Sequence, residues 1–260
     1  MTPAQAPAAT PAISVVIPTR NRGASIVATV ESILSNQDVD YEIVVVDQST
    51  NRLTCDALAK FTATPNLRLV RSNTQGSGRA RNIGLKVARG PIVLFTDDDC
   101  RVPANWIATM AACFAQDPRI GVVFCNVIAG PHDQGAGFVP TYVRHDDQMV
   151  RTLAEKRRAR GIGAGFGVRR KGMLKLGGFD EMLGPGARFS SNEEGDLAVR
   201  ALLHGWWIYE TCSVAVVHDG FRTWAEGKAL GKRNGIGVGA AYAKPLKCGH
   251  WRFAPVVLYE

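Results

Sequence analysis

Three consecutive carboxylates, Asp97, Asp98 and Asp99, follow the apolar residues of the run PIVLFTD, Pro91–Asp97. Such a run predicts a buried strand, and its carboxyl end is where open α/β sheets bind ligands. Adjacent carboxylates repel one another unless a cation or hydrogen-bond donors compensate, so a divalent metal ion is the simplest explanation. The alternative is an exposed acidic loop before the helix that Pro103 begins.

Polar side chains also follow two other apolar runs. Asp47 ends the run EIVVVD, and Thr19, Arg20 and Asn21 follow the run ISVVI. A carboxylate at this edge can accept the imide and hydroxyl hydrogens of a uridine, and Arg20 and Arg81 can face diphosphate oxygens. Asp47 can instead cap the turn that follows it, which is a common use of aspartate.

Apolar periodicity predicts the elements that must position these residues. The predicted strands are Ile13–Ile17, Glu42–Asp47, Leu67–Val70, Pro91–Asp97 and Ile120–Val127, and the predicted helices are Ile26–Leu34, Leu53–Phe61, Ser77–Ala88, one beginning near Pro103 and one near Asp196–His204. Strand, helix, strand is a parallel crossover unit, and near-continuous apolar strands suit a sheet that is covered on both faces. We therefore expect an α/β fold with a mostly parallel central sheet flanked by helices.

No linker divides the chain, so we expect one continuous domain with two halves. Residues 13–127 carry the pattern of a nucleotide-binding half, whereas residues 128–260 shift to glycine-rich loops and isolated strands, typical of a half that shapes a second substrate's site. Residues 1–12, rich in Pro and Ala, predict a disordered extension.

The composition excludes several classes of protein. Hydrophobic residues make up 46% and charged residues 21% of the chain, which is ordinary for a globular protein. The longest apolar stretch, Ile120–Gly130, is shorter than the roughly 20 residues that a membrane-spanning helix needs, and the first twelve residues lack the features of a secretory signal. The six cysteines form no CxxC pair, which argues against a zinc site or a disulfide framework. We therefore expect a cytoplasmic protein.

A net charge of +8 predicts a preference for anionic partners, without selecting among nucleic acids, lipid headgroups and phosphorylated small molecules. The densest basic cluster follows a short apolar stretch that contains Met149, Val150 and Leu153. It can be a solvated helix face or a peripheral contact with a membrane surface. The cluster consists of Arg151, Lys156, Arg157, Arg158 and Arg160.

Seven ordered segments between Ile13 and Asp219 resemble the family 2 glycosyltransferases, enzymes with a GT-A fold, in which a Rossmann-like sheet carries a smaller acceptor-side half. The segments are VVIPTRNR (Val15–Arg22), VVVDQST (Val44–Thr50), GSGRARNIGLKVARG (Gly76–Gly90), FTDDD (Phe95–Asp99), GGFDE (Gly177–Glu181), EEGDLAVR (Glu193–Arg200) and VVHDG (Val216–Gly220).

The resemblance implies a nucleotide diphosphate sugar donor, with UDP favoured, and a glycan or lipid-linked acceptor rather than nucleic acid. It implies that Asp47 contacts the base, Asp97 the ribose and Asp99 a Mn²⁺ or Mg²⁺ ion on the diphosphate. His218 would be a further metal ligand, although its position alone is typical of a satisfied histidine at a strand end. The remaining implied donor contacts are Pro18, Thr19, Arg20, Asn21, Arg81 and Asp98, and the implied acceptor contacts are Gly178, Phe179 and Asp180.

The catalytic base is where the sequence departs from the family pattern. The family usually has Glu followed by a catalytic Asp, whereas this chain has Glu193 followed by Glu194. Glu194 takes the base's position and Glu193 is the second candidate for an inverting transfer, in which a carboxylate removes the acceptor's proton. Both can instead serve the helix, because negative charge at a helix N-terminus is favourable.

Three rival functions remain at this point. A nucleotidyltransferase should have a glycine-rich basic loop after the first strand, and the loop PTRNR has no glycine. A dehydrogenase needs GxGxxG after that strand, and the near match GIGVGA, Gly235–Ala240, follows no predicted strand, so we interpret it as close packing. The altered pair Glu193 and Glu194 also permits a non-catalytic protein that binds sugar nucleotides.

Overall fold

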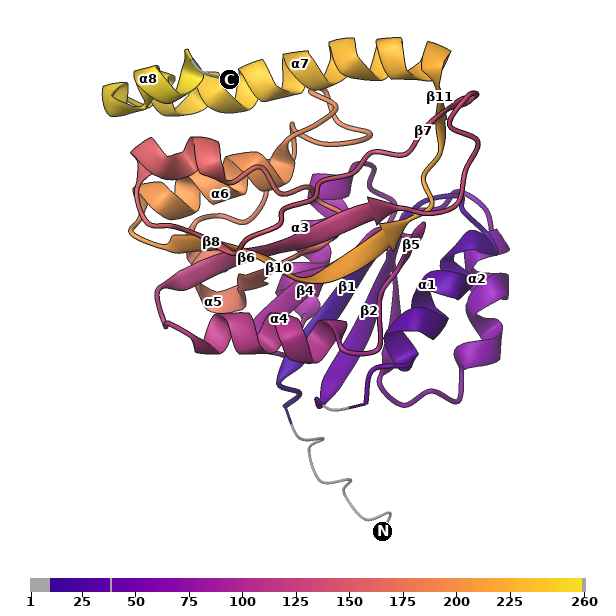
Figure 1. Cartoon of the computed structure of the whole chain (residues 1–260). Coiled ribbons are helices and arrows are strands. Elements are labelled where there is room, and N and C mark those ends of the chain that lie inside the picture. The colour runs from indigo at the N-terminus through magenta and orange to yellow at the C-terminus, as the bar shows by residue number, and fades with distance from the viewer. Residues whose placement is uncertain (1–9, 38, 259–260) are drawn as a thin grey trace.

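The computed structural model describes residues 10–37 and 39–258, which form an α/β structure with helices on both faces of a curled sheet (Figure 1). The prediction of a disordered extension lies, for residues 1–9, outside the described residues. The strands of the large sheet are β1 Ile13–Thr19, β2 Tyr41–Asp47, β3 Leu67–Arg71, β4 Ile92–Phe95, β5 Cys100–Arg101, β6 Ile120–Ala129, β8 Gln148–Val150, β9 Phe166–Arg169 and β10 Trp207–His218, and β7 Gly137–Phe138 pairs separately with β11 Arg222–Thr223.

The helices match the predicted ones closely in the first half of the chain. One predicted helix, Leu53–Phe61, is divided into an α-helix and a 3₁₀ turn, and the helix predicted near Asp196 begins three residues earlier. The α-helices are α1 Ser25–Leu34, α2 Leu53–Leu58, α3 Ser77–Val87, α4 Trp106–Ala115, α5 Arg170–Lys175, α6 Glu193–Leu203, α7 Trp224–Lys247 and α8 Ala254–Val257, and the 3₁₀ helices are η1 Ala59–Phe61, η2 Leu153–Arg158 and η3 Trp251–Phe253.

The first half of the sheet is parallel and buried on both faces. Strand β1 lies between β2 and β4 and runs parallel to both, and β3 extends this half beyond β2. Successive residues of β1 alternate between two cores, with Val15 packed in the core with residues of α1 and α4 and Val16 in the core with residues of α3. A Cβ on Gly84 of α3 would lie 2.3 Å from Val16 Cγ1, so this helix rests directly on the sheet. Because β1, β2 and β4 are largely apolar on both faces, the sequence shows near-continuous apolar runs there, whereas the edge strand β3 carries two arginines and is only partly buried.

The second half of the sheet is mixed. Strand β9 is antiparallel to both β4 and β6, and β10 is parallel to β6. The short strand β5 returns antiparallel to the end of β10, which places His218 opposite Cys100. This pairing joins the acidic run to a residue more than a hundred positions away in the chain.

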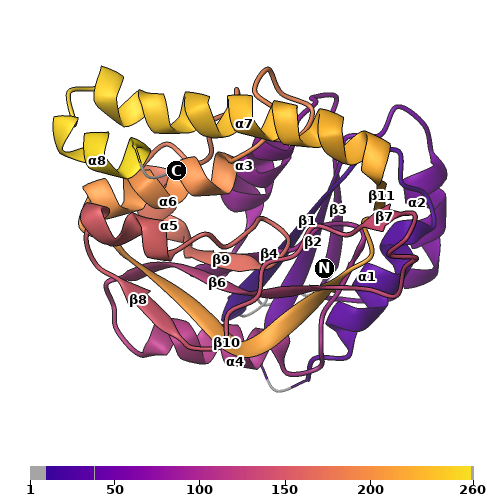
Figure 2. The same ribbon diagram turned by 45° about the horizontal axis from the view of Figure 1, so that its top comes forward.

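Helix α7 is the largest element that the sequence did not predict. It begins at a capping box formed by Thr223 and Glu226 and lies across α6 in both views (Figures 1 and 2). The GIGVGA segment is inside this helix, so it forms no dinucleotide-binding turn. A Cβ on Gly237 would lie 2.2 Å from Ser191 Oγ, so the interpretation as close packing is confirmed at that glycine. It is wrong for Gly235 and Gly239, where an added Cβ would meet no atom within 4 Å. None of the helices in the described ranges is both long enough and apolar enough to span a membrane.

The apolar stretch before the basic cluster belongs to the core. Val150 is fully buried, and Met149 and Leu153 pack against buried clusters. Lys156 is also buried, and its Nζ donates to the Ala159 carbonyl at 2.7 Å. These residues therefore form no exposed apolar stripe beside the arginines.

Candidate active site

A cavity of about 370 Å³ lies at the carboxyl ends of β1 and β4, where the sequence predicted a ligand site. The polypeptide leaves β4 at Phe95, turns at the acidic run and enters β5. Eight of the predicted site residues line this cavity. They are Pro18, Thr19, Arg20, Arg81, Asp97, Asp98, Asp99 and His218.

Arg81 fixes one side of the acidic run. Its guanidinium, 4% exposed, donates from Nη2 to Asp97 Oδ1 at 2.9 Å and to the Gly163 carbonyl at 3.1 Å. Nη1 donates to Glu193, whose carboxylate also accepts from Ser77. Burial disfavours the charge of Asp97 and raises its pKa, although Arg81 opposes this shift. This buried network holds α3, α6 and the acidic run together.

Arg22 pairs with the other side of the acidic run. Its Nε lies 3.1 Å from Asp98 Oδ1 and its Nη2 donates to Asp99 Oδ2 at 2.9 Å, while the side chain is 43% exposed. Burial raises the pKa of Asp98 to about 7 despite the charge of Arg22. Burial also acts to raise the pKa of Asp99, but the bond with His218 and the charges of His218 and Arg22 hold it below the usual value.

Asp99 and His218 fit a divalent cation. The His218 Nε2 atom lies 3.4 Å from Asp99 Oδ1, close to the roughly 3 Å between neighbouring ligands of an octahedral ion bound at about 2.1 Å. His218 Nδ1 donates to the Pro140 carbonyl at 3.0 Å, which orients Nε2 toward Asp99, where a bound ion would take the place of the Nε2 proton. A Cβ on Gly220 would lie 2.3 Å from His218 Nε2, so the glycine keeps this space open.

Cys100 also lies within reach of the two ligands but suits a hard cation poorly. Burial raises the pKa of its thiol well above the usual value, so the thiol stays protonated. Oxygen and imidazole ligands are those that Mg²⁺ and Mn²⁺ prefer. Of these three residues, Asp99 and His218 are therefore the ones whose chemistry fits such an ion.

Two residues predicted in the donor site lie away from the lining of the cavity. Asp47 is fully buried, its Oδ1 accepts from Ser49 N at 2.8 Å, and its Oδ2 lies 3.5 Å from Arg71 Nε without a hydrogen bond. Asn21 has φ of 56°, and its side chain accepts from the Thr50 backbone at 3.0 Å. Asn21 therefore joins the loops after β1 and β2, and contact between Asp47 and a base stays a prediction.

Glu194 lies beside the Arg81 network, in the first turn of α6. The Glu194 Oε1 atom accepts from the Gly163 amide at 3.0 Å, and the Gly163 carbonyl accepts from Arg81. Burial and the neighbouring Glu193 raise the pKa of Glu194 to about 8, while Arg81 counteracts them. Glu193 is buried in its ion pair, so Glu194 is the carboxylate with the freer side chain. Both residues occupy the helix N-terminus, as the alternative interpretation requires.

The predicted acceptor loop makes packing contacts in this structure. Phe179 is buried and its ring packs edge-on against Phe95, with centroids 5.3 Å apart. Gly178 has φ of 72°, and Asp180 binds Lys244 of α7 at 2.6 Å. None of the three lines the cavity beside the acidic run. Their contact with an acceptor stays a prediction.

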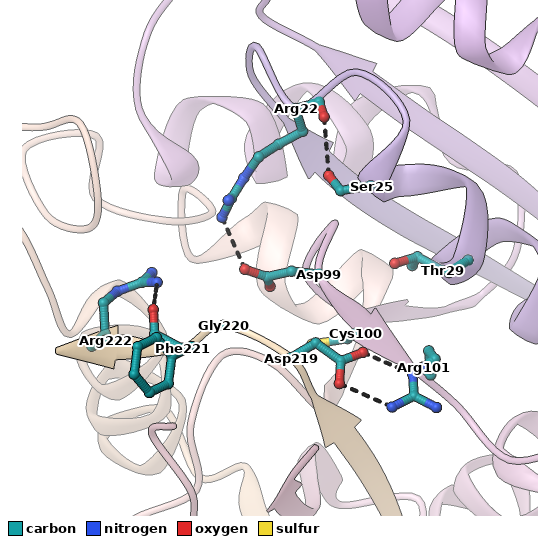
Figure 3. Close-up of a pocket in the computed structure, with 11 residues that line it drawn as sticks. Arg22, Ser25, Thr29, Asp99, Cys100, Arg101, Asp219, Gly220, Phe221 and Arg222 are labelled. Atoms are coloured by element: carbon teal, nitrogen blue, oxygen red, sulfur yellow. Dashed lines mark hydrogen bonds and ion pairs between the residues drawn. The ribbon is translucent and has the colours of Figure 1, made fainter. Parts of the chain in front are cut away.

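The sequence interpretation missed two arginines of the site, Arg22 and Arg222. Both line the first cavity and also a second one of about 410 Å³ on the other side of Asp99, shown in Figure 3. Arg22 is the last residue of the VVIPTRNR segment, and Arg222 lies two residues after the VVHDG segment, so the recognised motifs could have drawn attention to both. In the second cavity Arg101 pairs with Asp219 through bonds of 2.7 and 2.9 Å.

Comparison with known proteins assigns the chain to a family. A sequence profile described as Glycosyl transferase family 2 matches residues 14–176, more than half of the chain. The curated protein MT1568 of Mycobacterium tuberculosis, described as uncharacterized, is 38% identical over 117 residues, which make up 45% of this chain and 36% of that protein. The chain spans 36% to 57% of the length of the first curated relatives.

Solved structures show the same fold. The mannosyltransferase PcManGT from Pyrobaculum calidifontis, in complex with GDP-Man and Mn²⁺, has a TM-score of 0.68 and 22% identity, covering 93% of this chain and 66% of that one. TarS from S. aureus, in complex with UDP-GlcNAc, has a TM-score of 0.62 and 22% identity, covering 82% of this chain and 60% of that one. These likenesses confirm the GT-A fold that the sequence predicted.

Proposed function

The chain belongs to glycosyl transferase family 2, and from this premise we propose that it moves a sugar from a nucleotide diphosphate sugar to a hydroxyl group with inversion. A UDP-sugar is the favoured donor, and a glycan or a lipid-linked saccharide is the proposed acceptor. Solved structures of the same fold were obtained with UDP-GlcNAc and with GDP-Man and Mn²⁺, which supports a nucleotide sugar and a divalent ion.

The observation that carries the proposal is the pairing of Asp99 with His218 at the rim of a cavity lined by arginines. A bound Mn²⁺ or Mg²⁺ ion would neutralise charge on the departing diphosphate. Asp99 and His218 would hold this ion, and the oriented Nδ1 bond of His218 keeps Nε2 available to it. Thr19 and Gln48, which line the cavity near the ends of β1 and β2, would contact the nucleoside, and Asp97 would contact the ribose.

Glu194 is proposed as the base that takes the proton from the acceptor hydroxyl. Its carboxyl group accepts from the Gly163 amide and lies near Arg81 and Asp97, two residues that line the cavity, although Glu194 itself is not part of the lining. A base with a pKa near 8 accepts a proton more readily than an ordinary carboxylate, provided that it is ionised. Glu193 fits this role less well because Arg81 and Ser77 occupy its oxygens.

The proposal is tested by a panel of nucleotide sugars with Mn²⁺, scored by thermal stabilisation and by nucleotide release. Glu194→Gln should keep donor affinity within about threefold and lower transfer by about 10² to 10⁴, the usual contribution of a general base. Glu193→Gln is the matched variant on the same turn. Compared with Glu194→Gln, it should lower the free energy of unfolding more and the transfer rate less. Full transfer by Glu194→Gln would move the base to another residue, and failure of every donor to bind would exclude the function.

A second candidate function, binding of a sugar nucleotide without transfer, is favoured by one observation. With a pKa of about 8, most Glu194 side chains carry a proton at neutral pH and cannot act as a base. Wild-type protein that binds a donor tightly but releases no sugar at pH 9, with any hydroxyl acceptor offered, would support this candidate. Transfer above the rate of hydrolysis would exclude it.

The location of the protein is a further proposal. Arg157 and Arg158 are exposed in η2 and suit an anionic surface. We therefore propose the cytoplasm, with contact at the inner face of the membrane, as the location. The contact would be electrostatic, because the neighbouring Val150 is buried.

A further inference from the structure

We propose that Arg22 holds the cation position in the donor-free protein and that the divalent ion displaces it toward the diphosphate of the donor. This inference rests on the proposed function, because it concerns the same metal and donor site. It gives one side chain two successive partners and makes binding of the ion and binding of the donor depend on each other.

The contacts of Asp99 are the first observation. Its two oxygens are both engaged by cationic or proton-donating groups, Oδ2 by Arg22 at 2.9 Å and Oδ1 by His218 at 3.4 Å. Arg22 also reaches Asp98 at 3.1 Å, so its guanidinium spans two adjacent carboxylates, as a divalent cation would. A positive group therefore already compensates the acidic run.

The second observation is that Arg22 is free to leave. Its side chain is 43% exposed and lies in the loop after β1, next to Gly23 with φ of 57°. A cation bound by Asp99 and His218 would place two positive charges beside the guanidinium, so the ion and the Arg22 contact with Asp99 disfavour one another. Arg81, which is 4% exposed and bonded to Asp97, Glu193 and Gly163, has no such freedom.

The third observation is the position of Arg22 between two cavities. It lines both the cavity beside the acidic run and the second cavity, and Figure 3 shows its guanidinium pointing to Asp99 at their common boundary. Once released from Asp99, the guanidinium remains at the wall of the donor cavity. A guanidinium binds two phosphate oxygens in parallel, so the diphosphate is the natural second partner.

The test is to measure binding of Mn²⁺ alone, and then of UDP in the presence of Mn²⁺, to Arg22→Gln by titration calorimetry. Mn²⁺ alone should bind about tenfold more tightly than to the wild type, because one charge-assisted hydrogen bond no longer competes. UDP should bind about tenfold more weakly, because a diphosphate contact is lost. The two affinities thus move in opposite directions.

Arg101→Gln is the matched control, since it removes the same charge from a residue that pairs with Asp219 and not with Asp99. Its affinity for Mn²⁺ should stay within about threefold of the wild type. Arg22→Lys keeps the positive charge but loses the two parallel N–H donors of the guanidinium. Its affinities for Mn²⁺ and for UDP should lie between those of the wild type and Arg22→Gln.

Mn²⁺ binding to Arg22→Gln that equals or falls below wild-type binding would overturn the inference, because Arg22 would then not compete with the ion. If UDP bound with unchanged affinity while Mn²⁺ bound more tightly, the proposed contact between the released Arg22 and the diphosphate would be overturned. If wild-type protein bound neither Mn²⁺ nor UDP, the proposed function itself would fail, a result that is distinct from either of these. Circular dichroism of each variant checks that it is folded.

Discussion

Two arginines hold opposite ends of the acidic run, and their surroundings differ. Arg81 is buried among α3, α6 and the loop at Gly163, where it bonds to two carboxylates and a carbonyl and lies over the Phe166 ring at 5.5 Å. Arg22 is half-exposed in a loop, and its side chain pairs with Asp98 and Asp99. The first contact is part of the framework, whereas the second can be exchanged for a ligand. The same residue type thus serves stability at one end of the site and binding at the other.

The largest expected effect comes from Arg81→Gln, which removes the buried ion pairs of Arg81 with Asp97 and Glu193. The substitution leaves Glu193 buried without its cationic partner, so we expect a loss of about 3 to 5 kcal/mol in the free energy of unfolding. Urea denaturation measures it. The matched control is Arg79→Gln, two residues earlier on α3, whose ion pair with Glu181 is half-exposed and should contribute less than about 1 kcal/mol. Equal losses for the two variants would remove the distinction between framework and exchangeable contacts.

The next largest effect is expected from Asp99→Asn, at the partly exposed contact between Arg22 and Asp99. Loss of a ligand charge should weaken Mn²⁺-dependent donor binding by about 100-fold, while the free energy of unfolding changes by less than about 1 kcal/mol, because Asp99 bonds to groups that are not part of the buried framework. Titration calorimetry with UDP and Mn²⁺, beside urea denaturation, separates the two quantities. Asp219→Asn, which keeps Asp99 and His218, should bind the donor within about threefold of the wild type. A stability loss as large as that of Arg81→Gln would contradict the comparison.

The third effect is expected in the pH dependence of the transfer rate, at about tenfold for each pH unit. Burial raises the pKa of Glu194 to about 8, and a base works only when ionised, so the transfer rate should fall about tenfold for each pH unit below 8 and level off above it. The measurement is kcat at saturating donor and Mn²⁺ from pH 6 to 9. The residual activity of Glu194→Gln should lack this dependence. A rate that stays constant from pH 6 to pH 8 would exclude Glu194 as the titrating base.

Local pattern was sufficient for most of the first half of the fold. Strands β1, β2 and β4 were predicted because apolar residues on both faces give an uninterrupted run, and α1 and α3 because their buried residues recur at helical spacing. Other elements were missed because their sequences show no clear hydrophobic period. Strands β5 and β11 have two residues each, too few to show any period, and the glycines of α7 at 227, 231, 235 and 239 hide a helix that its capping box and its packing on α6 support.

The sequence by itself determined that three carboxylates stand at the end of a buried strand, since hydrophobic periodicity and the place of a strand end are properties of neighbouring residues. Only the tertiary structure decided which groups meet them. The antiparallel pairing of β5 with β10 brings His218 to Asp99, and the fold brings Glu193, in the first turn of α6, to Arg81 of α3. The tertiary structure also decided that Asp47 is buried and does not line the cavity, and that Arg22 reaches the acidic run. Such contacts depend on strand register and helix packing over a hundred residues of chain, which no local pattern encodes.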